Sequence, residues 1–301
     1  MPTPPLPLPT RMGVGPSCVA LPAGPWPTIA EFLVERFAAV PRSAWESRMR
    51  EGEVVDEHGM PVDLSRPYRP GLRVYYYRAL DTEPPIPFEE RILFRDAHLL
   101  AVDKPHFLPV TPTGRYVQQS LLVRLKRSLG LDQLVPLHRI DRETAGVVLF
   151  SVEPATRGRY GELFAQRAIA KRYEAVVAWR ADRELPRTRS SRLGDDTHFM
   201  RMREVPGEPN AHTHFELLES AGGWARLALS PITGRRHQLR VHCAALGMPI
   251  RNDAIYPVLR PEGSDDFEQP LQLLAKEVVF RDPLTGDERR FTSPRSLALP
   301  A

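Results

Sequence analysis

The sequence predicts an α/β protein in two parts, a small N-terminal unit and a larger domain in which strands and helices alternate. Three observations predict this class. The 301 residues are 42% hydrophobic and 26% charged, which is a globular composition with enough apolar material for a sizeable core. Residues 80–90 hold three prolines within four positions, as a linker does. After residue 90, short apolar runs alternate with amphipathic stretches to the end of the chain.

The charge balance is slightly basic. Lys plus Arg (41) exceed Asp plus Glu (37) by 4, and the pI is near 9.2, just above the value typical of nucleic-acid binders. No apolar run is long enough for a membrane span, so we expect no membrane association. The two cysteines, Cys18 and Cys243, lack the C-x-x-C spacing of a zinc site. The N-terminus has no apolar signal-peptide segment, and we expect a cytoplasmic protein.

The N-terminal part divides in two. Residues 1–25 are rich in proline and glycine and predict an extended arm. Residues 26–79 predict two helices, the first capped by Thr28, beside a small hairpin sheet. This combination resembles an S4-like RNA-binding module, in which Arg42 and Arg48 are candidate contacts to the RNA backbone. The alternative is a packing subdomain with ordinary surface arginines.

Residues 91–301 form the second predicted domain. An amphipathic helix with several basic side chains is expected over residues 120–129. Residues 181–212 contain many charges and helix breakers, which predict a surface insertion or a long hairpin.

The most informative stretch is residues 137–146, LHRIDRETAG, which directly precedes the apolar run of residues 147–150. Because that run must be buried, Asp141 is expected at the mouth of a core strand. A carboxylate on a loop fixed by such a scaffold is suited to nucleophilic or base chemistry. An Asp before a strand is more often a turn residue or an ion-pair partner, so the residues alone leave these alternatives open.

A second stretch, residues 171–179, alternates as a strand does and begins its apolar face with Tyr173. An aromatic ring at this place either stacks on a nucleic-acid base or packs in the core with its hydroxyl at the edge. Both interpretations are consistent with the residues.

A third stretch, residues 227–242, predicts a short strand that leads into a helix with Thr233 as N-cap and Gly247 as the stop. Arg236 and Arg240 are four residues apart and are expected to share a helix face. A helix start rich in Arg and His is either an anion site or a solvated basic face.

These stretches together resemble the RluA family of pseudouridine synthases. HRIDRETAG is similar to the family's H-R-[LI]-D-x-x-T-[SA]-G, KRYEAVV to its K-x-Y strand, and ITGRRHQLRVH to its T-G-R-x-H-Q-[LI]-R-x-H segment. The lead-in FRDAHLLAVDKPHFLPVTPT resembles the strand pair that precedes them. The resemblance covers residues 88–296. It implies an α+β type of fold with a long, bent, mostly antiparallel sheet, flanking helices and a central cleft.

The resemblance also implies roles for single residues. Asp141 aligns with the catalytic aspartate, Tyr173 with the tyrosine that packs against the target uracil, and Arg240 with the arginine that pairs with the carboxylate. Arg139 aligns with a residue that can fill the space left by an extruded nucleotide. Further substrate-binding candidates are His138, Arg142, Thr144, Arg235, Arg236, His237, Gln238 and Leu274, and candidate contacts to RNA phosphates are Arg124, Lys126 and Arg127. Leu274 stands where the family often has a histidine and is expected to form an apolar wall.

The implied reaction breaks the N1–C1′ bond of uridine, turns the uracil and joins C5 to C1′. It involves no net redox change and no hydrolysis, so neither a metal nor another cofactor is expected. The expected partner is structured RNA, which is tRNA, 23S rRNA or both, and the protein is expected to be monomeric. A flipped-out uridine must leave its stack, which favours loops and strained sites.

Two other functions are consistent with parts of the sequence. A non-catalytic RNA-binding or ribosome-assembly factor would keep the fold without needing Asp141. A glycosidase or nucleosidase would need a second carboxylate near Asp141. Glu143 is close in sequence, but two residues along an extended loop are expected to direct it away.

Overall fold

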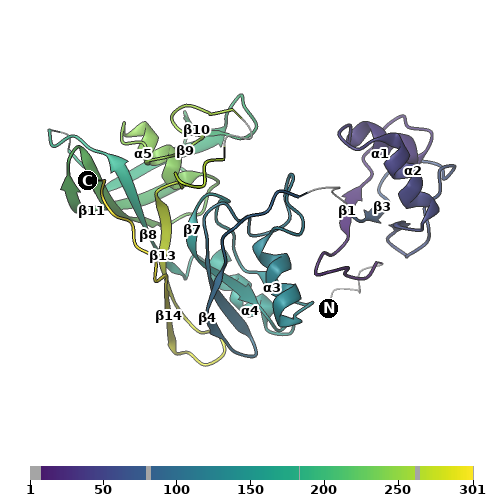
Figure 1. Ribbon diagram of the computed structural model, residues 1–301, viewed down its shortest axis with the longest axis horizontal. Helices are drawn as coiled ribbons and strands as arrows, with labels where there is room; N and C mark the ends of the chain where they lie inside the picture. Colours follow the sequence, from purple (N-terminus) through teal and green to yellow (C-terminus); the bar gives the residue numbers. More distant parts are fainter. Residues whose placement is uncertain (1–7, 79–82, 183, 262–264, 301) are drawn as a thin grey trace. The chain divides into compact units, whose positions relative to one another are not determined.

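A computed structural model describes residues 8–78, 83–182, 184–261 and 265–300 (Figure 1). The chain forms two units, and each is described separately below. The first contains residues 1–84 and 113–118, and the second contains residues 85–112 and 119–301. Residues 79–82, which belong to the expected end of the N-terminal unit and the expected linker, lie outside the described residues.

The N-terminal unit packs two helices on a small antiparallel sheet. Its strands are ordered β1 (Ser17–Ala20), β3 (Arg73–Tyr76) and β2 (Val54–Asp56), and its helices are α1 (Ile29–Arg36) and α2 (Arg42–Arg50). Thr28 caps α1 as predicted, because its hydroxyl accepts a hydrogen bond of 3.2 Å from the Glu31 N–H. Trp45, Phe32 and Val74 are buried in the shared core.

The arm predicted over residues 1–25 differs from the structure in its C-terminal part. Residues 17–20 are not an unpaired extended segment. They form β1, which pairs with β3 along its whole length, from Ser17 opposite Tyr76 to Ala20 opposite Arg73. An extended arm has unpaired backbone groups, and the edge of β3 satisfies them.

The larger unit is built on one sheet of eleven strands. In chain order its elements are β4 (Arg91–Arg95), β5 (Leu99–Lys104), α3 (Leu121–Leu129), β6 (Val135–Pro136), β7 (Ala145–Ser151), α4 (Arg157–Ala165), β8 (Ala170–Ala178), β9 (Thr188–Asp195), β10 (Met202–Val205), β11 (Ala211–Ala221), β12 (Trp224–Pro231), α5 (Gln238–Ala245), β13 (Leu273–Arg281) and β14 (Glu288–Thr292). None of the helices among the described residues is long and apolar enough to cross a bilayer.

The sheet has the strand order β10-β9-β11-β12-β8-β13-β7-β5-β4, with β14 on β13 and β6 on β7. Within the described residues, β7 and β13 run parallel and the other paired strands run antiparallel, which confirms the mostly antiparallel sheet. Figure 1 shows α3 and α4 beside the β4–β7 half of the sheet and α5 beside the β9–β12 half. Apolar side chains of α4 pack with β5, β7 and β13, and those of α5 pack with β8 and β12.

The two halves meet where β7 begins beside β13. Gly146 pairs with Ala275 at this point and has φ +115°, a conformation that residues with a Cβ rarely adopt. A Cβ at Gly146 would overlap the carbonyl oxygen of Ala275 and lie 2.8 Å from its nitrogen. The close approach therefore requires glycine, five residues after Asp141.

Two predicted elements have other bounds than expected. Residues 181–212 do contain a long hairpin, but its strands β9 and β10 extend the main sheet through β11. The third helix of the larger unit, α5, begins at Gln238 and not after Thr233, whose hydroxyl instead donates to the Gln238 side chain at 2.8 Å. Arg236 consequently precedes the helix and does not share a face with Arg240, while Gly247 ends it as predicted.

Candidate active site

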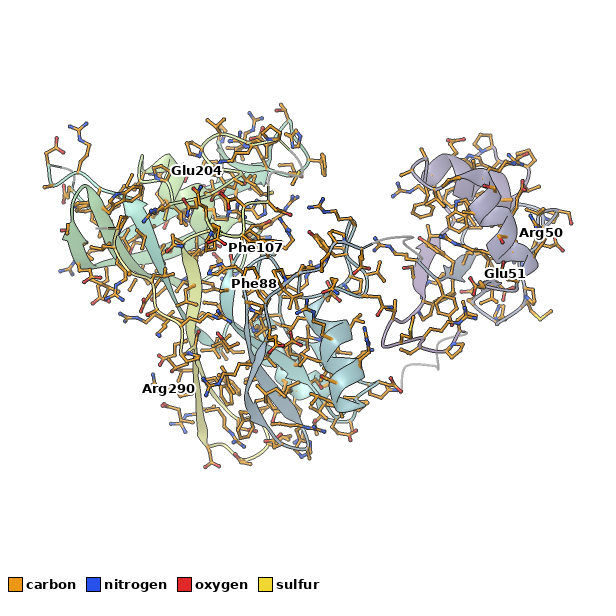
Figure 2. The ribbon with its side chains drawn as sticks, viewed as in Figure 1. Arg50, Glu51, Phe88, Phe107, Glu204 and Arg290 are labelled. Atoms are coloured by element: carbon orange, nitrogen blue, oxygen red, sulfur yellow. The ribbon has the colours of Figure 1, made fainter. Side chains whose placement is uncertain are left out.

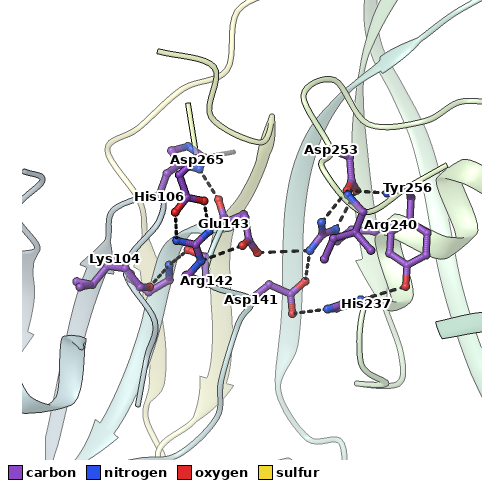
Figure 3. Close-up of polar contacts among 12 residues, drawn as sticks. Lys104, His106, Asp141, Arg142, Glu143, His237, Arg240, Asp253, Tyr256 and Asp265 are labelled. Carbon is purple, nitrogen blue, oxygen red and sulfur yellow. Dashed lines mark hydrogen bonds and ion pairs between the residues drawn. The ribbon is translucent and has the colours of Figure 1, made fainter. Parts of the chain in front are cut away.

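Asp141 lies in the loop that leads into β7, as the sequence predicts. The N–H of Thr144 donates to the carbonyl oxygen of Asp141 at 3.2 Å and closes the turn before the strand. The carboxylate lies 3.3 Å from Nη1 of Arg240 and its side chain remains 27% exposed (Figure 3). Asp141 is therefore fixed on one side and open to a ligand on the other.

Arg240 is the central cation of the site and its side chain is only 1% exposed. Its Nε and Nη2 donate to the two oxygens of Asp253 at 2.8 and 2.6 Å, while its Nη1 faces Asp141 and, at 3.6 Å, Glu143. Burial opposes the charge of Arg240, but the hydrogen bonds and negative charge of Asp253 raise its pKa above the usual value. The guanidinium thus remains charged although it is buried. For Arg240, this excludes the solvated basic face that was one interpretation of the stretch.

Glu143 corrects an expectation from the sequence. Its carboxylate is not directed away from Asp141, since both contact the same nitrogen of Arg240. Glu143 also accepts a hydrogen bond of 3.0 Å from Nε of Arg142. The loop is compact enough at this place to turn side chains two residues apart toward one cation.

Arg142 has a structural role in place of the predicted substrate contact. Besides Glu143, its guanidinium makes a bidentate pair with Asp265, one arm of which measures 3.0 Å. The same guanidinium lies 5.9 Å from the ring centre of Phe107, which stacks on Phe88 with ring centres 6.0 Å apart (Figure 2). With these partners Arg142 anchors the Asp141 loop.

Tyr173 lies on β8 and its ring packs at the edge of the cluster that contains Ala175 and Leu273. Burial, and in second place the negative charge of Asp141, raise the pKa of Tyr173 above its usual value. The hydroxyl therefore stays protonated at neutral pH, and the ring presents a partly buried aromatic face next to the carboxylate.

His237 faces the carboxylate oxygen of Asp141 that Arg240 does not contact. Its Nε2 lies 3.9 Å from Oδ1 of Asp141 and its Nδ1 lies 3.0 Å from the hydroxyl of Tyr256. Burial lowers the pKa of His237, which keeps the ring neutral at pH 7. The residue has φ +54° immediately before α5, a left-handed conformation that is uncommon outside glycine.

Several other predicted substrate contacts are part of the packing. Nε2 of His138 accepts a hydrogen bond of 3.1 Å from the Leu149 N–H, and its ring stacks on Phe164. Burial lowers the pKa of His138 to about 3. The Gln238 side chain donates to the His212 carbonyl oxygen at 2.9 Å and accepts from Thr233. These side chains therefore stabilise the fold around the site.

Thr144, Leu274 and Arg124 are also corrected. Thr144 is 2% exposed, and Leu274 is fully buried with Ala145 and Val176, so neither forms a wall of an open site. Because side chains alternate along β13, it is the preceding Leu273 that joins the cluster of Tyr173. Arg124 donates to the backbone carbonyls of residues 86 and 88 at 2.8 and 2.7 Å, which makes it an internal brace instead of a phosphate contact.

The remaining predicted contacts are at the surface or partly so. Arg139 and Arg236 are exposed and make no hydrogen bond or ion pair with another of the residues that the structure describes. Arg235 is exposed and donates to the Asn210 carbonyl oxygen at 3.3 Å. On α3, Arg127 is exposed, and burial lowers the pKa of Lys126.

Lys104 is a site residue that sequence reasoning missed. It is fully buried at the end of β5, and its Nζ donates to the carbonyl oxygens of Pro105, Leu108 and Arg142 at 2.9, 2.7 and 2.9 Å. Burial lowers its pKa to about 7. The bond to Arg142 ties the loop of Asp141 to β5. The sequence signal for a buried Lys104 is its place directly after LLAVD, a run that is apolar except for its last residue.

Comparison with known proteins identifies the class. A family model described as RNA pseudouridylate synthase matches residues 98–245. The human RNA pseudouridylate synthase domain containing 1 has the same fold, with a TM-score of 0.56, 22% identity, and coverage of 71% of this chain and 86% of the human one.

Among the residues described, no group of three or more His, Cys, Asp or Glu side chains is arranged to hold a metal ion.

Two relatives define the family. The dual-specificity RNA pseudouridine synthase RluA of Haemophilus influenzae is 30% identical over 218 residues, which are 71% of this chain and 97% of the relative. The mitochondrial tRNA pseudouridine(32) synthase of Saccharomyces cerevisiae is 31% identical over 185 residues, 58% of this chain and 38% of that protein. The chain belongs to the RluA family of RNA pseudouridine synthases, and it is an isomerase that acts on uridine in RNA.

Proposed function

We propose that Asp141 is the catalytic carboxylate and that it acts on a uridine flipped out of structured RNA. The observation that carries this proposal is that the Asp141 carboxylate is held at 3.3 Å by a fully buried arginine while its side chain remains 27% exposed. The buried guanidinium orients this carboxylate, and its exposed part leaves it within reach of a substrate. The carboxylate is presented to solvent in a protein whose substrate is a polyanion.

The residues around Asp141 suit the isomerisation. Breaking the N1–C1′ bond and forming C5–C1′ requires a group that attacks a carbon centre or removes a proton, and Asp141 serves either role in its ionised form. Arg240 orients the carboxylate. Tyr173 packs against the uracil, and the exposed Arg139 fills the space that the flipped nucleotide leaves in the RNA.

The RNA backbone is contacted by exposed or half-buried basic side chains. Arg235 and Arg236 precede α5, and Lys126 and Arg127 lie on α3. The N-terminal unit acts as an S4-like RNA-binding module, a proposal supported by its two helices, its small sheet and the basic side chains of α2. Phosphate contacts of this kind position an RNA without selecting its sequence.

The substrate is tRNA, 23S rRNA or both. The yeast relative is named for tRNA, and the Haemophilus relative for a dual specificity. We propose that the protein acts as a monomer in the cytoplasm, where both kinds of RNA are available, and that the reaction proceeds without a metal or another cofactor because it neither oxidises nor hydrolyses.

Tritium release from RNA that carries [5-³H]uridine tests the proposal, since forming pseudouridine expels the hydrogen on C5. Transcripts of tRNA and 23S rRNA are incubated separately with wild type, Asp141→Asn and Glu143→Gln. The second variant is the matched control, because its carboxylate contacts the same nitrogen of Arg240. We expect release by wild type and by Glu143→Gln, and none by Asp141→Asn with RNA affinity retained. Release by Asp141→Asn, or its loss together with RNA binding, would overturn the assignment.

A further inference from the structure

Both groups that face Asp141 are themselves held by one short loop. Arg240 pairs with Asp253, His237 with Tyr256, and these two partners are three residues apart (Figure 3). We propose that residues 252–256 are the positioning element of the active site, in which Asp253 sets the orientation of Arg240 and Tyr256 sets the ring tautomer of His237. The inference rests on the proposed role of Asp141.

The Arg240 guanidinium has a fixed orientation because Asp253 occupies one whole edge. Nε and Nη2 both donate to Asp253, and the rigid fork then directs Nη1 toward Asp141 and Glu143. Both side chains of the pair are 1% exposed. Without Asp253, the guanidinium would have two carboxylates on one side only and would turn to make a bidentate pair with one of them.

Asp253 is in turn held by its own loop. Its Oδ1 accepts hydrogen bonds from the N–H groups of Ile255 and Tyr256, at 2.8 and 3.0 Å. An aspartate that accepts from three residues cannot rotate without breaking several bonds at once. The orientation of Arg240 is therefore transmitted from the backbone of the loop.

Tyr256 controls His237 through a directed chain of hydrogen bonds. The N–H of Met202 donates to the Tyr256 oxygen at 2.7 Å, and the Tyr256 hydroxyl lies 3.0 Å from Nδ1 of His237. In the arrangement that we propose, the hydroxyl donates to Nδ1. A neutral imidazole whose Nδ1 accepts carries its hydrogen on Nε2. That N–H faces Oδ1 of Asp141 at 3.9 Å, one small movement from a hydrogen bond.

The consequence is that each carboxylate oxygen of Asp141 has its own donor. Oδ2 faces Arg240 and Oδ1 faces His237. Other ionisable groups that act at this place include Glu143, Lys104, Tyr173 and Arg236, none of which lies in the 252–256 loop. A disturbed 252–256 loop would act on these groups only through Arg240 and His237.

The test compares Asp253→Asn and Tyr256→Phe with two matched controls. Asp282 is also buried, accepts from a backbone N–H and pairs with an arginine, and Tyr160 is a buried tyrosine whose hydroxyl donates to Asp282 at 3.2 Å. Both belong to the α4 and β13–β14 packing and have no hydrogen bond to Arg240 or His237 among the residues described. Asp282→Asn and Tyr160→Phe thus remove similar bonds elsewhere.

We measure single-turnover tritium release, RNA affinity and urea unfolding for each variant. Asp253→Asn and Tyr256→Phe are expected to slow the reaction by about 10–100-fold with RNA affinity unchanged. The controls lose comparable stability and keep the rate.

Two further measurements keep the test decisive where Asp253→Asn is poorly folded. Asp253→Glu keeps the charge but displaces it by one carbon, and we expect it to slow the reaction while the fold is retained. Ring ¹⁵N shifts of His237, assigned with His237→Gln, are expected to report hydrogen on Nε2 in wild type and a tautomer mixture in Tyr256→Phe.

The outcomes separate this inference from the proposed function. Rates of Asp253→Asn and Tyr256→Phe that fall no further than those of the controls, or an unchanged tautomer in Tyr256→Phe, would overturn the positioning role while Asp141→Asn remained inactive. An active Asp141→Asn would overturn the proposed function first.

Discussion

Replacing Gly146 by alanine perturbs one of the two residue pairs through which β7 and β13 run side by side in parallel. The backbone there has φ +115°, and an added Cβ would overlap the carbonyl group of Ala275. Holding a residue with a Cβ in a sparsely populated backbone region costs about 1–3 kcal/mol. Forcing a methyl group into packed backbone costs about 1–3 kcal/mol more. We therefore expect Gly146→Ala to lower the free energy of unfolding by about 2–6 kcal/mol.

Two other glycines separate the contributions. Gly130 has φ +66° at the end of α3 with open space around it, so Gly130→Ala includes only the backbone term, about 1–2 kcal/mol. Gly161 lies inside α4 with an ordinary φ and nothing near its missing Cβ. Gly161→Ala is expected to raise the stability by about 0.5–1 kcal/mol, because it removes freedom from the unfolded chain.

Urea unfolding followed by circular dichroism measures all three variants, and hydrogen exchange of the β7 and β13 amides localises the change. The expected order of stability is Gly161→Ala, wild type, Gly130→Ala and then Gly146→Ala. Because Asp141 is five residues before Gly146, tritium release should also fall in Gly146→Ala under conditions where it is fully folded. A Gly146→Ala protein no less stable than Gly130→Ala would refute the reasoning that the strand crossing requires glycine.

Two further predictions concern acid stability and RNA affinity. The pKa of His138 is lowered from 6.5 to about 3, so between these values the unfolded chain binds a proton that the folded protein excludes, and stability is lost as the pH falls below 6.5. At pH 5 this loss is about 2 kcal/mol, and we expect it to disappear in His138→Asn, as urea unfolding at pH 7 and pH 5 will show; an equal loss in both proteins would contradict it. Replacing Arg42 and Arg48 by alanine should weaken RNA binding and leave kcat unchanged. The slope of log Kd against the logarithm of the salt concentration should fall by up to about 2. An unchanged RNA affinity would count against the S4-like role.

Much of the larger unit could be predicted because its signals are local. The apolar run after residue 146 forms β7, the alternating run at Tyr173 forms β8, and the expected amphipathic helix is α3. Asp141 was placed correctly at the mouth of a core strand for the same reason, since a carboxylate directly before a buried run has few other places to lie. Membership in a family with a defined motif then supplied the reaction.

The partners of side chains could not be predicted in the same way. Arg124 and Arg127 look alike in the sequence, yet Arg124 braces backbone carbonyls from residues 86–88 and Arg127 is exposed. Glu143 turns toward Arg240 because a segment about a hundred residues away places the cation there. Such contacts depend on elements that the chain brings together only after it folds.

The sequence by itself determined the family, the loop that presents Asp141 and elements such as β7, β8 and α3, because periodicity and motif act over a few residues. Only the tertiary structure decided that Leu273 and not Leu274 joins the cluster of Tyr173, since one step along a strand exchanges the two faces of the sheet. It also decided that one loop, through Asp253 and Tyr256, holds both donors to Asp141. Burial and hydrogen-bond geometry are properties of the folded chain, so the partners of each motif residue are set only when the chain has folded.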